Sequence, residues 1–151
     1  MKEKIKIGVI GTGFARLTQI PAFVNCEDTE VVSIASASLT NAEKTAADFG
    51  IEHATDNWRE TVRREDIDLI SITTPPNLHH EMTLFAIEHN KHILCEKPMA
   101  MNASEAKEMT DKAKDNLKAA SEYLMNILTK DNLKKEDFLA AVNCDCEIGT
   151  E

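Results

Sequence analysis

The stretch Ile5-Lys6-Ile7-Gly8-Val9-Ile10-Gly11-Thr12-Gly13 decides the fold, because a short apolar run ends directly on a pair of glycines. Such a run predicts a buried strand, and the residues after Gly13 have a helical pattern. Gly11 permits a tight turn, Gly13 lets the backbone approach a pyrophosphate, and the helix amino terminus supplies free N–H donors. The segment is therefore a candidate phosphate-binding loop. The alternative is an ordinary strand-to-helix turn that merely needs glycine.

Arg16 stands where a dinucleotide-binding loop usually has a third small residue. A bulky side chain there threatens the close packing of the helix on the strand. Its guanidinium could instead reach a phosphate, and the sequence leaves both possibilities open.

Apolar runs of strand length alternate with helical patterns from the amino terminus onward. This alternation is typical of β-α-β units and of a parallel sheet buried on both faces. The expected strands cover residues 5–10, 31–36, 52–54, 67–73 and 92–95. The predicted fold class is α/β, a Rossmann-type doubly wound parallel sheet of about five strands.

Helix start and stop signals fall between these strands. Three capping pairs place a capping side chain three residues before a carboxylate. They are Thr40 with Glu43, Asn57 with Glu60, and Asn102 with Glu105. Gly50 and Asn90 follow helical patterns as carboxyl-terminal caps. Pro21 lies inside the first helical pattern, which it should kink or divide.

From Ser104 onward the apolar residues follow steps of three and four, which predicts one long helix, with a second helix at 133–142. Up to Leu117 this apolar face can pack on the chain's own sheet. Further apolar residues lack an obvious partner within the chain: Ala120, Leu124, Ile127 and Leu128. We therefore expect self-association, or binding of a separate chain, through this segment. The expected division is a dinucleotide-binding domain at 1–118 and a helical extension at 119–151.

Composition narrows the function classes. With 151 residues, 42% of them hydrophobic, the chain can bury one sizeable core. A net charge of −9 repels nucleic acids and anionic membrane surfaces, so neither is an expected partner. The sequence shows no secretory apolar region and no membrane-length apolar stretch, so we expect a cytoplasmic location. Cys144 and Cys146 offer only two thiolates near the chain end, and no metal site is expected.

The end of the second expected strand, Ser36-Ala37-Ser38, bears on coenzyme choice. An NAD-preferring domain usually places Asp or Glu there to hold the ribose hydroxyls, and this sequence has neither. Nothing then repels a 2′-phosphate, and Ser36, Ser38, Asn41 and Lys44 could supply donors or charge to it. NADP is therefore favoured over NAD. The alternative is that residues 38–41 form a capped loop and that Lys44 is a solvated helix residue.

Two further segments follow later strands at the carboxyl edge, where parallel sheets bind ligands. They are Thr73-Thr74-Pro75-Pro76-Asn77-Leu78-His79 and Cys95-Glu96-Lys97-Pro98. A lysine at this edge can orient a substrate hydroxyl or share its proton during hydride transfer. A carboxylate beside the lysine can tune it or hold a ribose. Taken singly, each segment could also be an ordinary loop or solvated turn.

Taken in order, these segments closely resemble the amino-terminal half of the Gfo/Idh/MocA family, named for glucose-fructose oxidoreductase and inositol dehydrogenase. The resemblance covers residues 4–115. It rests on Gly11-Thr12-Gly13-Phe14, Gln19-Ile20-Pro21-Ala22-Phe23, Thr74-Pro75-Pro76-Asn77-Leu78-His79 and Glu96-Lys97-Pro98. Ser36 with Asn41-Ala42-Glu43-Lys44 is also similar to the NADP-binding segment of glucose-fructose oxidoreductases.

The resemblance implies a nicotinamide dinucleotide, NADP or NAD, bound along the carboxyl edge. The expected cofactor-binding residues are Gly11, Thr12, Gly13, Phe14, Ser36, Ser38, Lys44, Thr74, Pro75, Asn77, His79, Glu96 and Lys97. Lys97 would be the catalytic lysine near the reactive ring, and the Lys97-Pro98 bond is often cis in such folds. For His79 and His80 the alternative is a position at a helix start facing solvent.

Family members continue with a sixth strand and a large antiparallel domain that binds substrate and supplies an Asp and a His. This chain continues instead as an amphipathic helix, so the second, substrate domain is expected to be absent. Hydride transfer with a sugar- or polyol-type substrate should then be weak or absent in the chain alone, since orientation contributes several kcal/mol to catalysis. Two alternatives are a substrate site completed by another chain and a non-catalytic interaction or regulatory module that self-associates.

Overall fold

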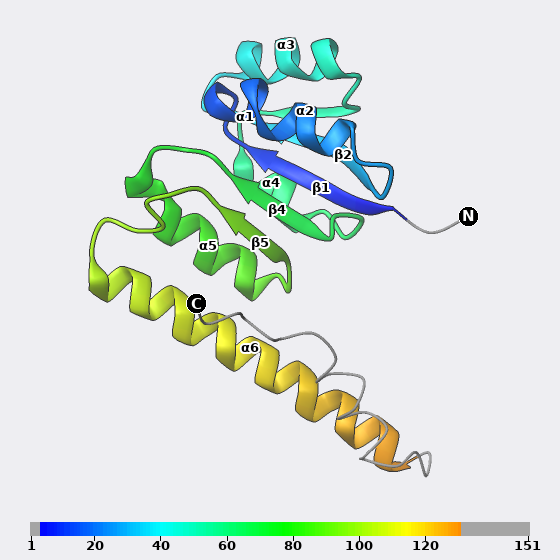
Figure 1. Cartoon of the computed structure of the whole chain (residues 1–151), viewed down its shortest axis with the longest axis vertical. Coiled ribbons are helices and arrows are strands. Elements are labelled where there is room, and N and C mark those ends of the chain that lie inside the picture. Colours follow the sequence, from blue (N-terminus) through cyan, green and yellow to red (C-terminus); the bar gives the residue numbers. More distant parts are fainter. Residues whose placement is uncertain (1–3, 131–151) are drawn as a thin grey trace, which may run out of the picture. The chain divides into compact units, whose positions relative to one another are not determined.

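The computed structural model describes residues 4–130 and contains one parallel β-sheet flanked by helices. The strands are β1 (Ile5–Ile10), β2 (Thr29–Ala35), β3 (His53–Thr55), β4 (Leu69–Ile72) and β5 (His92–Cys95). They pair in the order β3-β2-β1-β4-β5, and every pairing is parallel (Figure 1). The predicted five-stranded Rossmann-type sheet is confirmed, and each expected strand is present with ends that differ by at most a few residues.

The helices follow the expected alternation. They are α1 (Gly13–Leu17), α2 (Gln19–Val24), α3 (Leu39–Phe49), α4 (Trp58–Arg63), the short 3-10 helix η1 (Pro76–Leu78), α5 (His79–Glu88) and α6 (Ala103–Lys130). The sheet and the helices through residue 113 form one compact unit, and the later part of α6 belongs to a second. Among residues 4–130, no helix has both the length and the apolar character needed to cross a membrane.

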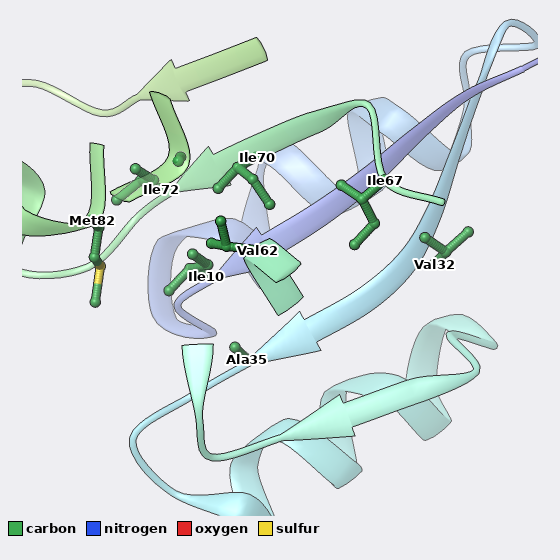
Figure 2. Close-up of a cluster of buried hydrophobic side chains, with 9 residues drawn as sticks. Ile10, Val32, Ala35, Val62, Ile67, Ile70, Ile72 and Met82 are labelled. Carbon is green, nitrogen blue, oxygen red and sulfur yellow. The ribbon is translucent and has the colours of Figure 1, made fainter. Parts of the chain in front are cut away.

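Apolar side chains cover both faces of the sheet, as a parallel sheet requires. On one face, Ile70 and Ile72 of β4 pack with Val62 of α4 and with Met82 of α5 (Figure 2). On the other face, Ile7, Val9 and Ile34 pack with residues of α1, α2 and α3. Apolar residues of β1 therefore contribute to both layers, Ile10 to the first and Ile7 and Val9 to the second, which explains why the strand lacks strict alternation.

Four of the five predicted helix caps are confirmed, and one is wrong. The side chain of Asn57 accepts a hydrogen bond from the N–H of Arg59 at 3.2 Å. Asn102 and Glu105 form a reciprocal capping pair at 3.0 and 2.9 Å, and Gly50 ends α3 in the left-handed conformation with φ 69°. The expected cap Thr40 lies inside α3 instead.

The cap of α3 is Ser38, whose hydroxyl accepts from the N–H of Asn41 at 3.5 Å. The helix begins at Leu39, so its first turn starts two residues earlier than the Thr40 pattern indicated. Asn90, the other expected stop signal, has a positive φ of 57° just after α5. This conformation fits its predicted role in ending that helix.

The first helical pattern is divided, but not at Pro21. The break lies at Thr18, whose dihedral angles of −132° and −62° separate α1 from α2. The Thr18 hydroxyl donates to the carbonyl of Phe14 at 2.9 Å. Pro21 lies in the first turn of α2, where a missing N–H removes no helical hydrogen bond.

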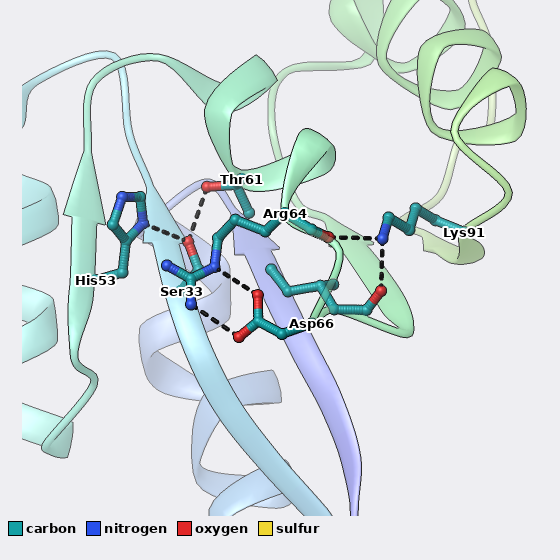
Figure 3. A network of polar contacts seen from close by, with 7 residues as sticks. Ser33, His53, Thr61, Arg64, Asp66 and Lys91 are labelled. Atoms are coloured by element: carbon teal, nitrogen blue, oxygen red, sulfur yellow. Dashed lines mark hydrogen bonds and ion pairs between the residues drawn. The ribbon is translucent and has the colours of Figure 1, made fainter.

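Polar contacts fix the segments around α4. Buried Ser33 of β2 lies 2.9 Å from the Nδ1 atom of His53 and 2.9 Å from the hydroxyl of Thr61 (Figure 3). Lys91 donates to the carbonyl oxygens of Arg64 and Ile67, each at 2.7 Å. The two hydrogen bonds of Lys91 connect the carboxyl end of α4 with the segment that leads into β5.

Arg64 also forms an ion pair with Asp66 at 2.8 Å (Figure 3). The hydrogen bonds from the guanidinium lower the pKa of the Asp66 carboxyl below its ordinary value. The turn after α4 is therefore held both by this pair and by Lys91.

The long carboxyl-terminal helix expected from Ser104 is confirmed as α6. Met109 on this helix is buried, and Glu108 accepts a hydrogen bond from His80 of α5 at 3.0 Å. The second helix expected at 133–142 and the pair Cys144 and Cys146 lie outside the described residues.

Candidate dinucleotide-binding site

A pocket of about 400 Å³ lies at the carboxyl edge of the sheet. Residues that follow β1, β2, β3 and β4 all contribute to its wall. The lining residues are Ile10, Gly11, Thr12, Gly13, Ser36, Ala37, Asp56, Trp58, Thr73, Thr74, Pro75, Leu78 and Met82. Six predicted cofactor-binding residues are thus brought together around one pocket: Gly11, Thr12, Gly13, Ser36, Thr74 and Pro75.

The two loop glycines differ in what surrounds them. Gly11 has φ 107°, and a Cβ atom there would lie 2.6 Å from the Thr73 hydroxyl oxygen and 2.9 Å from its carbonyl carbon. Gly13 has ordinary backbone angles, and a Cβ atom there would meet nothing within 4 Å. The turn itself therefore needs glycine at 11, whereas the space at 13 is open to a ligand.

Gly13 is also the first residue of α1, so unsatisfied N–H groups of the first helical turn lie beside this open space. No acidic side chain occurs in that turn. Backbone donors at a helix start, next to a residue without a side chain, are what a pyrophosphate requires.

Arg16 does not face the pocket. Its guanidinium forms an ion pair with Asp48 of α3. The neighbouring Ala15 is fully buried and supplies the small residue that packs between the helix and the sheet. The expected disturbance of the packing at Arg16 is therefore wrong, and the guanidinium is paired with Asp48.

The end of β2 contacts the glycine loop. The Ser36 and Thr12 hydroxyl oxygens lie 3.3 Å apart, which joins two walls of the pocket. The Ser36 hydroxyl also accepts from the N–H of Ser38 at 3.4 Å. Ser38 caps α3, and Lys44 is exposed on the same helix. Neither Ser38 nor Lys44 lines the pocket.

Trp58 and Asp56 were missed by the sequence analysis. Both follow the short strand β3 and line the pocket. Trp58 packs edge-on against Phe85, with ring centroids 5.2 Å apart, and the Arg59 guanidinium lies 4.2 Å from its centroid. Their position directly after a strand of the parallel sheet was a signal that could have been used, because all such strands end at one edge.

The segment after β5 is fixed at its backbone. Glu96 donates its N–H to the carbonyl of Ile72 at 3.0 Å, which extends the β4–β5 pairing by one residue. The Lys97-Pro98 peptide bond is cis, as the family resemblance implied. Lys97 is exposed, and its N–H donates to the Glu96 carboxylate at 3.2 Å.

His79 is buried rather than solvent-facing, with 1% of its surface exposed. Its ring nitrogens lie 2.8 Å from the carbonyl oxygen of Thr74 and 3.0 Å from that of Pro98. A carbonyl oxygen only accepts, so the imidazole makes both bonds when both nitrogens carry hydrogen. His79 therefore joins the loop after β4 to the Lys97-Pro98 segment through its side chain.

Phe14, Asn77 and His80 do not line the pocket. Phe14 is 49% exposed at the start of α1, and Asn77 is exposed on η1. His80 is half-buried against Glu108. Within residues 4–130, no three His, Cys, Asp or Glu side chains gather as ligands for a metal ion.

The sheet order, the glycine loop at the end of β1 and the shared pocket define a nucleotide-binding domain of the Rossmann class. Residues 5–124 match the profile of a family described as an oxidoreductase family with an NAD-binding Rossmann fold. The chain belongs to this family, Gfo/Idh/MocA.

Several curated relatives are named for reactions of sugar-related compounds. The chain is 36% identical over 126 residues to a dTDP-3,4-didehydro-2,6-dideoxy-alpha-D-glucose 3-reductase of Saccharopolyspora spinosa, covering 82% of this chain and 38% of that protein. It is 32% identical to a scyllo-inositol 2-dehydrogenase (NADP(+)) of Bacillus subtilis, covering 74% and 34%. The chain thus spans about a third of the length of the curated relatives it matches.

Solved structures share the fold. A 3-ketoreductase from Actinomadura kijaniata in complex with TDP-benzene and NADP superimposes with a TM-score of 0.72 at 29% identity, covering 76% of this chain and 36% of that one. A biliverdin reductase from Synechocystis in complex with biliverdin and NADP+ superimposes with a TM-score of 0.69 at 27% identity, covering 74% and 35%. The matched part in each case is about a third of the longer chain.

Proposed function

We propose that the pocket holds NADP or NAD and that the chain is the coenzyme-binding part of an oxidoreductase. The observation that carries this proposal is the open space at Gly13, bounded by the start of α1 and by Ser36 and Thr74. The pyrophosphate would accept hydrogen bonds from the N–H groups of the loop and of the first helical turn. Trp58, after β3, offers an aromatic wall on the side of β2.

The bound dinucleotide would supply the hydride acceptor or donor for a sugar- or polyol-type substrate. Lys97 is exposed beside the Glu96 carboxylate at the same edge of the sheet. Its ammonium group could hold a substrate hydroxyl and exchange a proton with it at the carbon that gains or loses hydride. Glu96 would hold hydroxyl groups of the ribose next to the nicotinamide.

We favour NADP over NAD. The end of β2 has Ser36 in place of a carboxylate, and Lys44 is exposed on the helix that follows. Two structural neighbours are described as NADP complexes. Calorimetric titration should give tighter binding of NADPH than of NADH. Replacing Lys44 with Ala should weaken the binding of NADPH by about threefold, as expected for an exposed charge pair, and leave the affinity for NADH unchanged.

The decisive measurement is titration of the purified chain with NADPH and NADH, with Gly13→Trp as the matched variant. The indole would fill the open space, so binding should disappear while the far-ultraviolet circular dichroism spectrum stays the same. A folded wild-type chain that binds neither coenzyme would overturn the proposal. We expect binding with little or no turnover, because about two thirds of each longer relative lies outside the part that this chain matches.

Self-association is the second candidate function. The helix α6 runs without interruption to Lys130, and Leu117 on it is 69% exposed. A helix with an exposed apolar side chain can pair with another copy through that side chain. Sedimentation velocity over a hundredfold concentration range should show a dimer or larger species. A monomer at every concentration would contradict it, and Gly13→Trp should not change the result.

A further inference from the structure

A chain of side-chain hydrogen bonds joins β4, the start of α2 and the segment after β5, next to Lys97. It starts at Ser71 in the middle of β4, whose side chain is fully buried. The Ser71 hydroxyl donates to the Oε1 atom of Gln19 at the start of α2. The Nε2 atom of Gln19 donates in turn to the Oε1 atom of Glu96 at 2.7 Å. Segments far apart in the sequence are thereby joined at one point.

The orientation of the Gln19 carboxamide follows from its partners. Glu96 as a carboxylate can only accept hydrogen bonds. If the amide were turned around, its oxygen would face the carboxylate oxygen, and two acceptors would lie against each other. The Ser71 hydroxyl can donate to the amide oxygen, so the observed orientation satisfies all three groups.

The division between α1 and α2 explains how Gln19 reaches this position. Thr18 leaves helical geometry, and Gln19 becomes the first residue of a new helix. The residues on either side are fixed by packing, because Ala15 and Ile20 are both fully buried. The side chain of Gln19 is only half-exposed and lies between β4 and the segment after β5.

We infer that Gln19 is a positioning residue, anchored on Ser71, that holds the Glu96 carboxylate in the one orientation needed to bind the nicotinamide half of the coenzyme. The inference rests on the proposed function. The other carboxylate oxygen of Glu96 accepts the N–H of Lys97 at 3.2 Å, so the two bonds fix the carboxylate plane. Lone pairs on both oxygens remain available to ribose hydroxyl donors.

A fixed carboxylate binds a hydroxyl better than a mobile one because its rotamer freedom is already lost before the ligand arrives. Gln19 therefore contributes to binding without touching the coenzyme. Its effect should appear with ligands that reach Glu96 and should vanish with ligands that do not.

Two substitutions of similar size separate the two bonds of Gln19. Gln19→Met removes both the acceptor for Ser71 and the donor to Glu96. Gln19→Glu keeps an acceptor for Ser71 but places a second carboxylate against Glu96. Both substitutions should weaken the binding of NADPH by about tenfold or more, as expected when a hydrogen bond to a charged group is lost. The loss in Gln19→Glu should be at least as large as the loss in Gln19→Met.

The matched ligand is 2′,5′-ADP, which lacks the nicotinamide riboside. Its affinity should change by less than about twofold in either variant, since it does not extend to Glu96. Adding Gln19→Met to Glu96→Ala should cause no further loss of NADPH affinity. An equal loss for both ligands, or additive losses in the double variant, would overturn the inference and show that Gln19 serves only the fold.

A measurement without coenzyme completes the test. The side-chain amide resonances of Gln19 can be assigned by their loss in Gln19→Met, and Glu96→Ala should move them and speed their exchange with water. If these resonances do not change in Glu96→Ala, the inference about Gln19 is overturned and the proposed function is not affected. A wild-type chain that binds no dinucleotide would overturn the proposed function, and with it the coenzyme role of the pair, whatever the resonances show.

Discussion

The two loop glycines should respond oppositely to alanine. At Gly11, φ is 107°, and a Cβ atom would lie 2.6 to 2.9 Å from atoms of Thr73. The backbone strain costs about 1–3 kcal/mol, and the forced displacement of neighbours costs about another 1–3 kcal/mol. A loss of that size is a large part of a typical total stability of about 5–15 kcal/mol. We therefore expect Gly11→Ala to unfold at markedly lower urea concentration.

At Gly13 the Cβ atom would meet nothing within 4 Å, and the residue begins α1. Alanine is favoured over glycine in a helix by about 0.5–1 kcal/mol, so Gly13→Ala should be as stable as the wild type or slightly more so. The methyl group would nevertheless occupy the space next to the pyrophosphate. Loss of one hydrogen bond to a charged group costs about 1.5–3 kcal/mol, which corresponds to a tenfold or greater loss of NADPH affinity.

Urea unfolding followed by circular dichroism measures the first effect, and calorimetric titration with NADPH measures the second. The expected pattern is an unstable Gly11→Ala and a stable Gly13→Ala that binds poorly. A Gly13→Ala variant with wild-type affinity would refute the placement of the pyrophosphate. A Gly11→Ala variant with wild-type stability would refute the reasoning about the turn.

Three other substitutions or reactions test the framework of the site. Gly8→Ala should cost about 1–3 kcal/mol in urea unfolding, because its Cβ atom would lie 2.6 Å from a side-chain carbon of Thr61; an unchanged midpoint would contradict the close approach of α4 to β1. Lys91→Met should cost about 1–3 kcal/mol, since two donors to carbonyl oxygens are lost. Hydrogen exchange should then quicken at residues 64–67, and unchanged exchange there would count against the contact. Burial raises the pKa of the Cys95 thiol above its ordinary value, so iodoacetamide at pH 8 should modify exposed Cys26 well before Cys95. Peptide mass mapping measures the order in which the two thiols are modified. Equal rates of modification would show that Cys95 is more accessible than its burial indicates.

Most of the sheet could be predicted because its signals are local. The run at residues 5–10 is apolar except for Lys6 and is followed by glycine, so its length and its boundary are both visible. Asn57 and Asn102 each cap a helix through atoms only two or three residues away. Interactions of this range depend on the sequence nearby and little on the rest of the fold.

The errors arose where several local arrangements were compatible with the sequence, or where a distant partner decides the position of a side chain. Thr18 divides the first helix, and the Pro21 signal could not show this because a proline in the first turn is compatible with helix. The Arg16 guanidinium forms an ion pair with Asp48, which is remote in sequence. Ser38 caps α3 in preference to Thr40, a shift that depends on where β2 ends.

The candidate site was predictable in part for the same reason. Gly11 was predictable because the turn there requires glycine, and Gly13 because it follows at the spacing of a dinucleotide-binding loop. His79 acts through carbonyl oxygens of Thr74 and Pro98, and no periodicity or motif shows which carbonyl a buried imidazole will meet. Trp58 becomes part of the pocket only because β3 pairs with β2 and ends at the same edge.

The glycine loop and the Lys97 segment are therefore held in place by different means. The glycine loop depends on the absence of side chains at Gly11 and Gly13, so almost any larger side chain there affects the turn or the proposed coenzyme site. The Lys97 segment depends on side chains that reach it from elsewhere, Gln19 from α2 and His79 from α5. Those contacts can be altered one at a time while the sheet stays intact. Substitutions at Gln19 or His79 should thus adjust the nicotinamide end of the site without removing the capacity to bind the adenosine half.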